Sequence, residues 1–165
     1  MFFVYISIIM KNFTTYETDT EKDSFNIAIV ISEYNIRITE ALLRGALRFL
    51  ENVNCEPTAV YKTAGAFEIP LVCKKIFSSQ KADGIIALGA VIRGDTPHFD
   101  YVCNEASRGV MNVSLEKEKP IAFGVLTTDN IEQAIRRAGE DEDNKGYEAA
   151  QSLWQTLRLI KKAKI

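Results

Sequence analysis

The sequence has few of the residues that bind metal ions or form disulfide bonds. It contains one histidine, His98, in 165 residues, so a site with several histidine ligands cannot form within one chain. Its three cysteines, Cys55, Cys73 and Cys103, include no CxxC pair. An odd number of widely spaced cysteines favours reduced, buried thiols. We therefore expect no metal site, no disulfide framework and a cytoplasmic location.

Neither an excess of basic residues nor a long apolar run is present. Lysine and arginine total 20, aspartate and glutamate total 22, and the net charge is -2. This balance argues against nucleic-acid binding, which needs a basic surface. The apolar residues 1–10 are fewer than the roughly 20 that a membrane helix needs, and they lack the basic start of a signal peptide. We expect no membrane partner and interpret residues 1–24 as an N-terminal arm.

From residue 25 onward, short apolar runs alternate with segments of helical periodicity. The apolar runs predict buried strands at 25–32, 58–61, 83–89 and 120–126. The helical periodicity predicts helices at 39–51, 68–77, 97–115, 129–138 and 146–161. Strand–helix alternation implies a parallel sheet with helices on both faces. We predict one α/β domain, residues 25–165, with a four-stranded parallel sheet in a three-layer αβα sandwich of flavodoxin-like type.

Chemically informative residues follow each predicted strand. The carboxyl ends of parallel strands meet at one edge of a sheet, and ligands bind beyond that edge. The four loops there include the aromatic residues Tyr34 and Phe67, a glycine-rich turn, the only histidine and a helix start; they are residues 32–35, 65–70, 90–100 and 127–130. No single element is specific. Together they predict a pocket with flat stacking surfaces and an anion site.

His98 lies at the start of a predicted helix. Thr96 can cap that helix, and Pro97 suits its first turn. The free N–H groups of a helix start favour a phosphate and disfavour an imidazolium, so His98 is expected to be neutral and able to accept and return protons. A lone histidine is more often an ordinary surface or core residue. Its place at the ligand-binding edge favours the catalytic interpretation.

Three further residue types have a plain and a functional interpretation. Arg136 and Arg137 end a short helix, where both can be solvated, or one can grip a phosphate with the bidentate geometry that lysine lacks. Tyr34 and Phe67 can be core aromatics, but the glycine, asparagine and glutamate beside them favour a pocket edge. The plain interpretation of Lys145 is an exposed lysine in the turn that starts a helix.

Five segments resemble the motifs of one enzyme family, the lumazine synthases, in order and spacing. The resemblance covers about residues 25–160. The segments are GAFEIP at 65–70, GAVIRGDTPHFDYVCNE at 89–105, FGVLTTDN at 123–130, Arg137-Ala138-Gly139 and Asn144-Lys145-Gly146.

The resemblance implies a transferase of riboflavin biosynthesis. It implies that 5-amino-6-(D-ribitylamino)uracil condenses with 3,4-dihydroxy-2-butanone 4-phosphate, forming 6,7-dimethyl-8-ribityllumazine, phosphate and water without a metal or organic cofactor. Imine formation, phosphate elimination and ring closure need proton transfers, and holding the two reactants together supplies much of the acceleration.

The same resemblance implies the site residues. His98 moves protons, Tyr34 stacks on the pyrimidine, backbone groups of residues 90–92 meet the ring edge, and Phe123, Arg137 and Lys145 come from a neighbouring subunit. The full substrate-binding set is Tyr34, Asn35, Ala66, Phe67, Glu68, Ile69, Ala90, Val91, Ile92, Asp95, Thr96, Phe123, Arg137 and Lys145. The family usually has phenylalanine or tryptophan at the position of Tyr34, and a tyrosine ring can still stack on the pyrimidine.

A site shared between subunits implies a homo-oligomer. The family is built on homopentamers, some of which form an icosahedral shell of sixty subunits, and riboflavin synthase is a candidate partner. The absence of an insertion between residues 139 and 144 favours the shell, whereas the four acidic residues at 140–143 oppose it by repulsion between pentamers.

Three other classes fit less well. A flavodoxin-like binding module needs a Ser/Thr-rich phosphate loop after the first strand, but residues 32–35 are short and acidic. A receiver domain needs clustered acids after the first strand, which are absent. A purely structural shell protein has no need of Phe67, His98 and Arg137 together.

Overall fold

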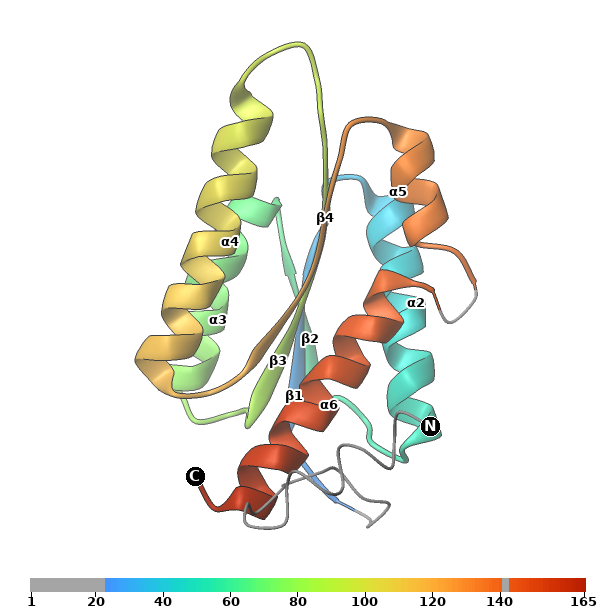
Figure 1. Ribbon diagram of the computed structural model, residues 1–165. Helices are drawn as coiled ribbons and strands as arrows, with labels where there is room; N and C mark the ends of the chain where they lie inside the picture. The colour runs from blue at the N-terminus through green and yellow to red at the C-terminus, as the bar shows by residue number, and fades with distance from the viewer. Residues whose placement is uncertain (1–22, 141–142) are drawn as a thin grey trace, which may run out of the picture.

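The computed structural model describes residues 23–140 and 143–165 and confirms the predicted α/β sandwich. Its sheet has the strand order β2-β1-β3-β4, and every neighbouring pair is parallel (Figure 1). The strands are β1 (Ile27–Ser32), β2 (Ala59–Thr63), β3 (Gly84–Ile92) and β4 (Ile121–Thr128). Because all four run in one direction, their carboxyl ends meet at a single edge, at the top of Figure 1.

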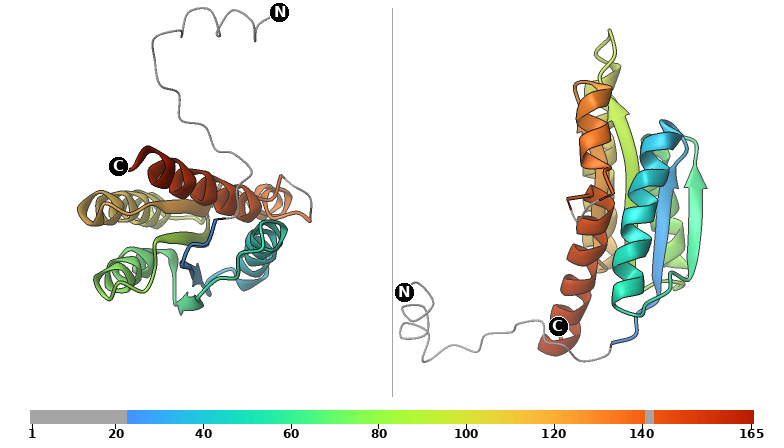
Figure 2. Two further views of the ribbon diagram at one scale, coloured as in Figure 1. Left: turned by 90° about the horizontal axis from the view of Figure 1, so that it is seen from below. Right: turned by 90° about the vertical axis from the view of Figure 1, so that its right-hand side faces the viewer.

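Helices cover both faces of this sheet, which gives three layers (Figure 2). On one face lie α3 (Ile69–Ser78) and α4 (His98–Lys117), with a short 3-10 helix, η1 (Ala66–Glu68), before α3. On the other lie α2 (Ile36–Asn52), the short α5 (Ile131–Arg137) and α6 (Lys145–Ala163).

The alternation of side chains along the inner strands builds the two halves of the core. In β1, Ile27, Ile29 and Ile31 pack toward α2 and α6, whereas Ala28 and Val30 pack toward α3 and α4. All five are at most 2% exposed. A strand buried on both faces needs apolar residues at every position, which explains the continuous apolar run in the sequence.

The structure corrects three predicted details. Strand β3 ends at Ile92 rather than at residue 89, so Ala90, Val91 and Ile92 belong to the strand and not to the loop. Helix α5 begins at Ile131 rather than at residue 129 and is capped by Asn130, whose side chain accepts a hydrogen bond from the Gln133 backbone. Helix α2 begins three residues earlier than the predicted 39, after Asn35 in the left-handed conformation (φ 59°).

Two regions singled out in the sequence fall partly outside the described residues. Of the expected N-terminal arm, only residues 23 and 24 are described. Of the acidic run at 140–143, only Glu140 and Asp143 are described. Asp23 ties the start of the domain to α6, because its carboxylate bonds Arg158 Nε at 2.8 Å and also pairs with Lys161. The hydrogen bond from Lys161 lowers the pKa of Asp23.

The burial of Cys73 predicts a thiol that does not react in the folded protein. This side chain is fully buried between α3 and the sheet, and burial raises its pKa to about 12. Since the thiolate is the reactive form, we expect no alkylation of Cys73 by iodoacetamide at pH 8, and full alkylation after unfolding in guanidinium. Peptide mass mapping before and after unfolding measures both. Rapid native labelling would contradict this placement.

Candidate active site

A pocket of about 540 Å³ opens at the carboxyl edge of the sheet. It lies where β1, β2 and β3 end and is bordered by η1 and the start of α4. We call it the edge pocket; its lining residues are Tyr34, Gly65, Ala66, Phe67, Glu68, Ala90, Val91, Ile92, Gly94, Thr96, His98, Phe99, Tyr101 and Val102. This volume suits a molecule of drug-like size.

The loop after β1 holds Tyr34 at the mouth of this pocket. The Tyr34 backbone N–H donates to the carbonyl of Ala64 at 3.1 Å, and the Asn35 side-chain amide donates to the carbonyl of Ala90 at 2.9 Å. These bonds fix the loop against β2 and β3, while the Tyr34 side chain remains 71% exposed. Asn35 thus holds the pocket wall together, and it is not among the residues that line the pocket.

The turn before α3 presents Phe67 and Glu68. The Glu68 carboxylate accepts a hydrogen bond from the Gly65 backbone at 2.9 Å, which closes the turn. Phe67 is 56% exposed and lines the pocket with the even more exposed Tyr34 and Tyr101, and exposed apolar side chains gathered in this way mark a surface that a ligand or another chain covers. Ile69, which follows Glu68, is fully buried in the core beneath α3 and does not line the pocket.

The end of β3 forms the floor of the pocket. Pairing of β3 with β1 ends at Leu88, whereas pairing with β4 continues to Ile92. On the β1 side, the backbone of residues 90–92 is therefore no longer covered by a neighbouring strand. It faces the pocket, where a flat ring edge can reach it.

The start of α4 places His98 at the rim. His98 lies in the first turn of the helix, as expected, but the helix begins at His98 rather than at Pro97, and Pro97 rather than Thr96 occupies the cap position. The Thr96 hydroxyl accepts a long hydrogen bond, 3.4 Å, from the His98 backbone. Thr96 and His98 both line the edge pocket, whereas the exposed Asp95 does not.

Arg93 is a residue whose importance the sequence did not reveal. Its guanidinium bonds Asp100 at 2.9 and 3.2 Å and Asp129 at 3.3 Å, and it lies 4.1 Å from the centre of the Phe99 ring. The hydrogen bonds from Arg93 lower the pKa of Asp100. The sequence showed only that an arginine ends an apolar run. It did not show the role of this arginine, because its partners Asp100 and Asp129 lie 7 and 36 residues away.

The other three predicted residues line a second concavity, of about 400 Å³, on the far side of β4. We call it the β4 groove; Phe123, Arg137 and Lys145 line it together with Glu148 of α6. Lys145 Nζ lies 2.5 Å from a Glu148 carboxylate oxygen, and Arg137 Nη1 donates to the Gln133 carbonyl at 3.1 Å. None of these residues lines the edge pocket, so a single chain does not bring the two sets together.

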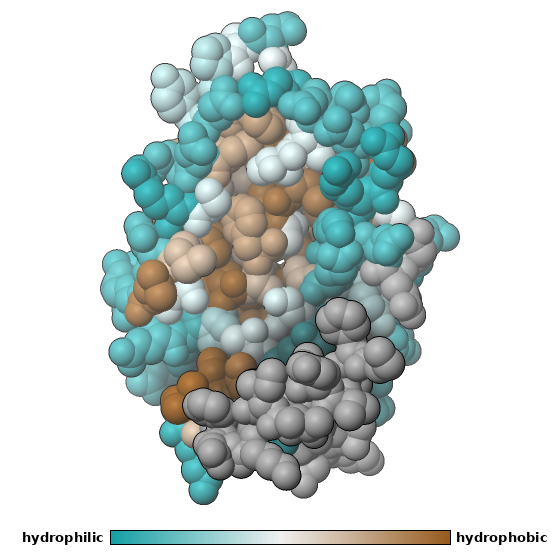
Figure 3. All heavy atoms as spheres, in the orientation of Figure 1, coloured by the Kyte–Doolittle hydropathy of each residue, from teal (hydrophilic) through white to brown (hydrophobic). Residues whose placement is uncertain are grey.

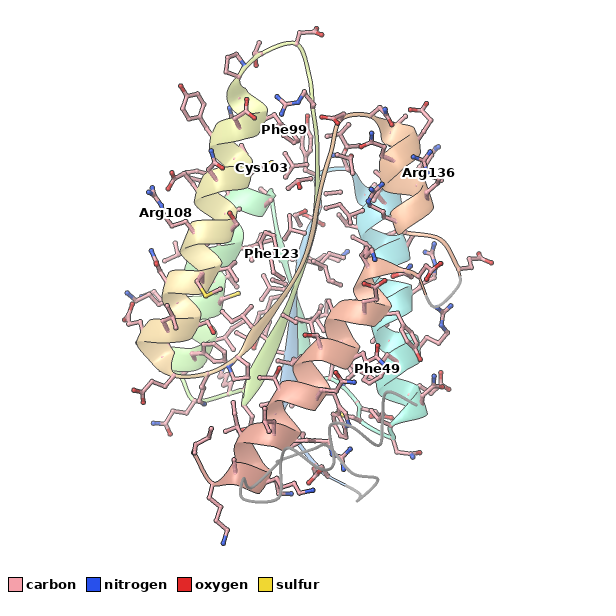
Figure 4. All side chains as sticks on the ribbon, viewed as in Figure 1. Phe49, Phe99, Cys103, Arg108, Phe123 and Arg136 are labelled. Carbon is pink, nitrogen blue, oxygen red and sulfur yellow. The ribbon has the colours of Figure 1, made fainter. Side chains whose placement is uncertain are left out.

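Apolar surface is exposed around the β4 groove. Figure 3 shows a hollow with apolar residues at its centre, between polar rims, and Figure 4 places Phe123 between α4 and α6. Phe123 is 40% exposed and Ile135 of α5 is 55% exposed. Exposed apolar surface of this kind marks ligand or protein contact sites.

The described residues offer neither a metal-binding cluster nor a membrane-spanning helix. In residues 23–140 and 143–165, no group of three or more histidine, cysteine, aspartate or glutamate side chains is arranged to hold a metal ion. Within the same ranges, no helix combines the length and apolarity needed to cross a bilayer.

Comparison with known proteins agrees with the motifs. A family described as 6,7-dimethyl-8-ribityllumazine synthase matches residues 24–161. Similar proteins include the 6,7-dimethyl-8-ribityllumazine synthases of Desulfovibrio desulfuricans, 46% identical, and Nitratidesulfovibrio vulgaris, 48% identical. Each match extends over 153 residues, which is 92% of this chain and 98% of the relative. These matches confirm the resemblance found in the sequence, and the chain belongs to the 6,7-dimethyl-8-ribityllumazine synthase family.

Proposed function

We propose that the edge pocket of one subunit and the β4 groove of a neighbour form one active site. There the chain condenses 5-amino-6-(D-ribitylamino)uracil with 3,4-dihydroxy-2-butanone 4-phosphate and yields 6,7-dimethyl-8-ribityllumazine, phosphate and water. The chain is thus a transferase of riboflavin biosynthesis.

The observation that carries the site assignment is the composition of the edge pocket. Nine residues expected to bind substrate or move protons line this single pocket: Tyr34, Ala66, Phe67, Glu68, Ala90, Val91, Ile92, Thr96 and His98. Tyr34 and Phe67 offer flat apolar faces for the pyrimidine. Apart from the Ala90 carbonyl, which accepts from Asn35, the backbone at the end of β3 that no β1 residue pairs with offers hydrogen-bond partners for the edge of that ring.

The second substrate carries a phosphate, which needs positive charge. The start of α4 presents backbone N–H groups beside His98, and Arg137 and Lys145 of the β4 groove bring cationic side chains. His98 then passes protons as the amine attacks the ketone, water leaves and phosphate is eliminated. No covalent bond to the protein is required, so proximity supplies much of the rate.

A site of this kind requires an oligomer, and we assign the chain to a homopentamer. Exposed Phe123 and Ile135 and the open mouth of the edge pocket are the surfaces that such contacts would cover. A sixty-subunit shell built from twelve pentamers and an interaction with riboflavin synthase extend this proposal. The proposal includes a cytoplasmic location, which is supported by the three free cysteines, of which Cys55 and Cys73 are buried.

The test is a direct assay with the two substrates, combined with a pair of adjacent arginine variants. We expect the wild-type protein to form the fluorescent lumazine. Arg137→Ala is expected to lower kcat/KM for the phosphate substrate about 10²-fold, because a charge-assisted contact to a dianion is lost. Arg136→Ala is the matched control, since this arginine does not line the groove and should leave kcat/KM unchanged.

Two outcomes would speak against the assignment. Absence of lumazine formation by the wild-type protein would refute the activity. Equal defects in Arg136→Ala and Arg137→Ala, or an equal rise in KM for both substrates, would make the role of Arg137 structural.

A further inference from the structure

The guanidinium of Arg93 joins three segments at the rim of the edge pocket. Two of its nitrogens bond the Asp100 carboxylate in the first turn of α4, and its Nε bonds Asp129 in the turn between β4 and α5. Its flat face lies 4.1 Å from the ring centre of Phe99. The Arg93 backbone N–H also donates to the Thr128 carbonyl at 2.9 Å. One side chain therefore links the end of β3, the start of α4 and the end of β4.

Few buried side chains hold the start of α4. The first fully buried residue of this helix is Ala106, eight positions after His98, and residues 93–98 are all exposed. The first turn of the helix thus extends beyond the core, and Val102 in the next turn is partly buried and packs against it. Figure 4 shows Phe99 on the side of α4 that faces β4, which is the side where Arg93 meets it.

These contacts are too exposed to matter much for global stability. The side chains of Arg93, Asp100 and Asp129 are 41%, 51% and 70% exposed, and ion pairs so open to solvent contribute little to folding. Their geometry is nevertheless specific. A planar guanidinium can fork onto Asp100, reach Asp129 through Nε and stack on Phe99 at once, and a lysine cannot.

We propose that Arg93 is a positioning residue, which holds His98 and the N–H groups of the α4 start in place against the end of β3 and the β4–α5 turn. The inference rests on the proposed function, since it takes His98 and the α4 start to act on substrate. Arg93 does not touch substrate in this role. It acts through Asp100 and Phe99, the second and first residues after His98.

The experiment compares Arg93→Lys and Arg93→Ala with the wild-type full-length enzyme. Both variants are expected to lose about 10–10²-fold in kcat, because a misplaced proton-transfer group costs rate. KM for the pyrimidine should stay within about threefold, since Tyr34 and Phe67 stand on other segments, and Tm should change by less than about 4 °C. Arg108→Ala is the matched control: Arg108 also pairs with an acid on α4, Glu105, but points away from β4 in Figure 4, and kcat should be unchanged.

A double-mutant cycle tests whether Arg93 acts through Asp100. Asp100→Asn should lower kcat by itself, and its effect should largely vanish in the Arg93→Lys background. If Arg93→Ala fails to assemble, Arg93→Lys decides: reduced kcat at unchanged Tm supports the role, and wild-type kcat overturns it.

The experiment also distinguishes failure of this inference from failure of the proposed function. Wild-type kcat in both Arg93 variants, with Phe67→Ala strongly impaired, overturns the role of Arg93 and leaves the edge pocket as the site. Unimpaired turnover in Phe67→Ala removes the pocket assignment and, with it, the basis for the Arg93 role. A rise in pyrimidine KM that matches the kcat defect indicates general collapse of the pocket and also overturns the inference.

Discussion

The substitution Gly146→Ala is expected to destabilise the fold by about 3 kcal/mol or more. A Cβ at this position would lie 1.9 Å from the carbonyl oxygen of Leu42 in α2, well inside contact distance. The neighbour is backbone, so no side-chain rotation can relieve the clash, and α2 and α6 must move apart. Helix propensity acts in the opposite direction, since alanine is normally favoured over glycine in a helix by about 1 kcal/mol.

The control for this prediction is another glycine-to-alanine change. A Cβ at Gly94 has nothing within 4 Å, so Gly94→Ala should alter stability by less than about 1 kcal/mol, while it changes the unfolded chain in the same way. Thermal unfolding at equal protein concentration compares the two variants. A Gly146→Ala protein as stable as wild type would show that α2 and α6 are not in backbone contact there.

This close contact also serves the β4 groove. Asn144, which is 1% exposed, caps α6 through the N–H groups of Gly146 and Tyr147 and donates to the carbonyls of Ala41 and Gly139. Lys145 lies between Asn144 and Gly146, so its backbone is fixed against α2 while its side chain lines the groove. The contact that packs α6 against α2 thus also fixes the position of Lys145, a proposed substrate contact.

The sequence predicted the parts of this structure that depend on local patterns. The continuous apolar run of β1 reflects burial on both faces of the sheet, and Leu42, Ala46 and Leu50 lie on the one buried face of α2, a helix with about 3.6 residues per turn. A pattern of this kind identifies the type of an element, although not its last residue. Strand β3 extends to Ile92 because β4 pairs with it as far as Thr128, and the apolar residues 90–92 do not by themselves show how far a partner strand continues.

The candidate site was predictable only as far as its motifs are contiguous in sequence. Ile69 was expected in the pocket because it follows Phe67 and Glu68, but it starts the buried face of α3 that continues in Cys73 and Ile76. That spacing was visible and could have placed it in the core. Arg93 had no such signal, because its role depends on Asp129 after β4.

The division of the predicted residues between two surfaces leads to the last prediction, which concerns mixed oligomers. His98→Ala impairs the edge pocket and Arg137→Ala impairs the β4 groove, so each pure variant has only defective sites. If each site joins the pocket of one chain to the groove of another, random co-assembly in equal amounts gives about one quarter of the sites two intact halves. We therefore expect the mixture to regain about one quarter of wild-type kcat, well above either variant alone.

The matched control for this complementation is a mixture of His98→Ala with Phe67→Ala. Both changes lie in the edge pocket, so every site in that mixture keeps a damaged pocket whichever chains meet, and activity should not rise above the separate variants. Refolding or co-expressing the two chains and measuring lumazine formation per subunit gives the comparison. A site contained within one chain predicts no gain in either mixture. Equal gains in both would mean that assembly, rather than a shared site, restores activity; a gain confined to the pocket–groove pair requires that the two surfaces meet between subunits.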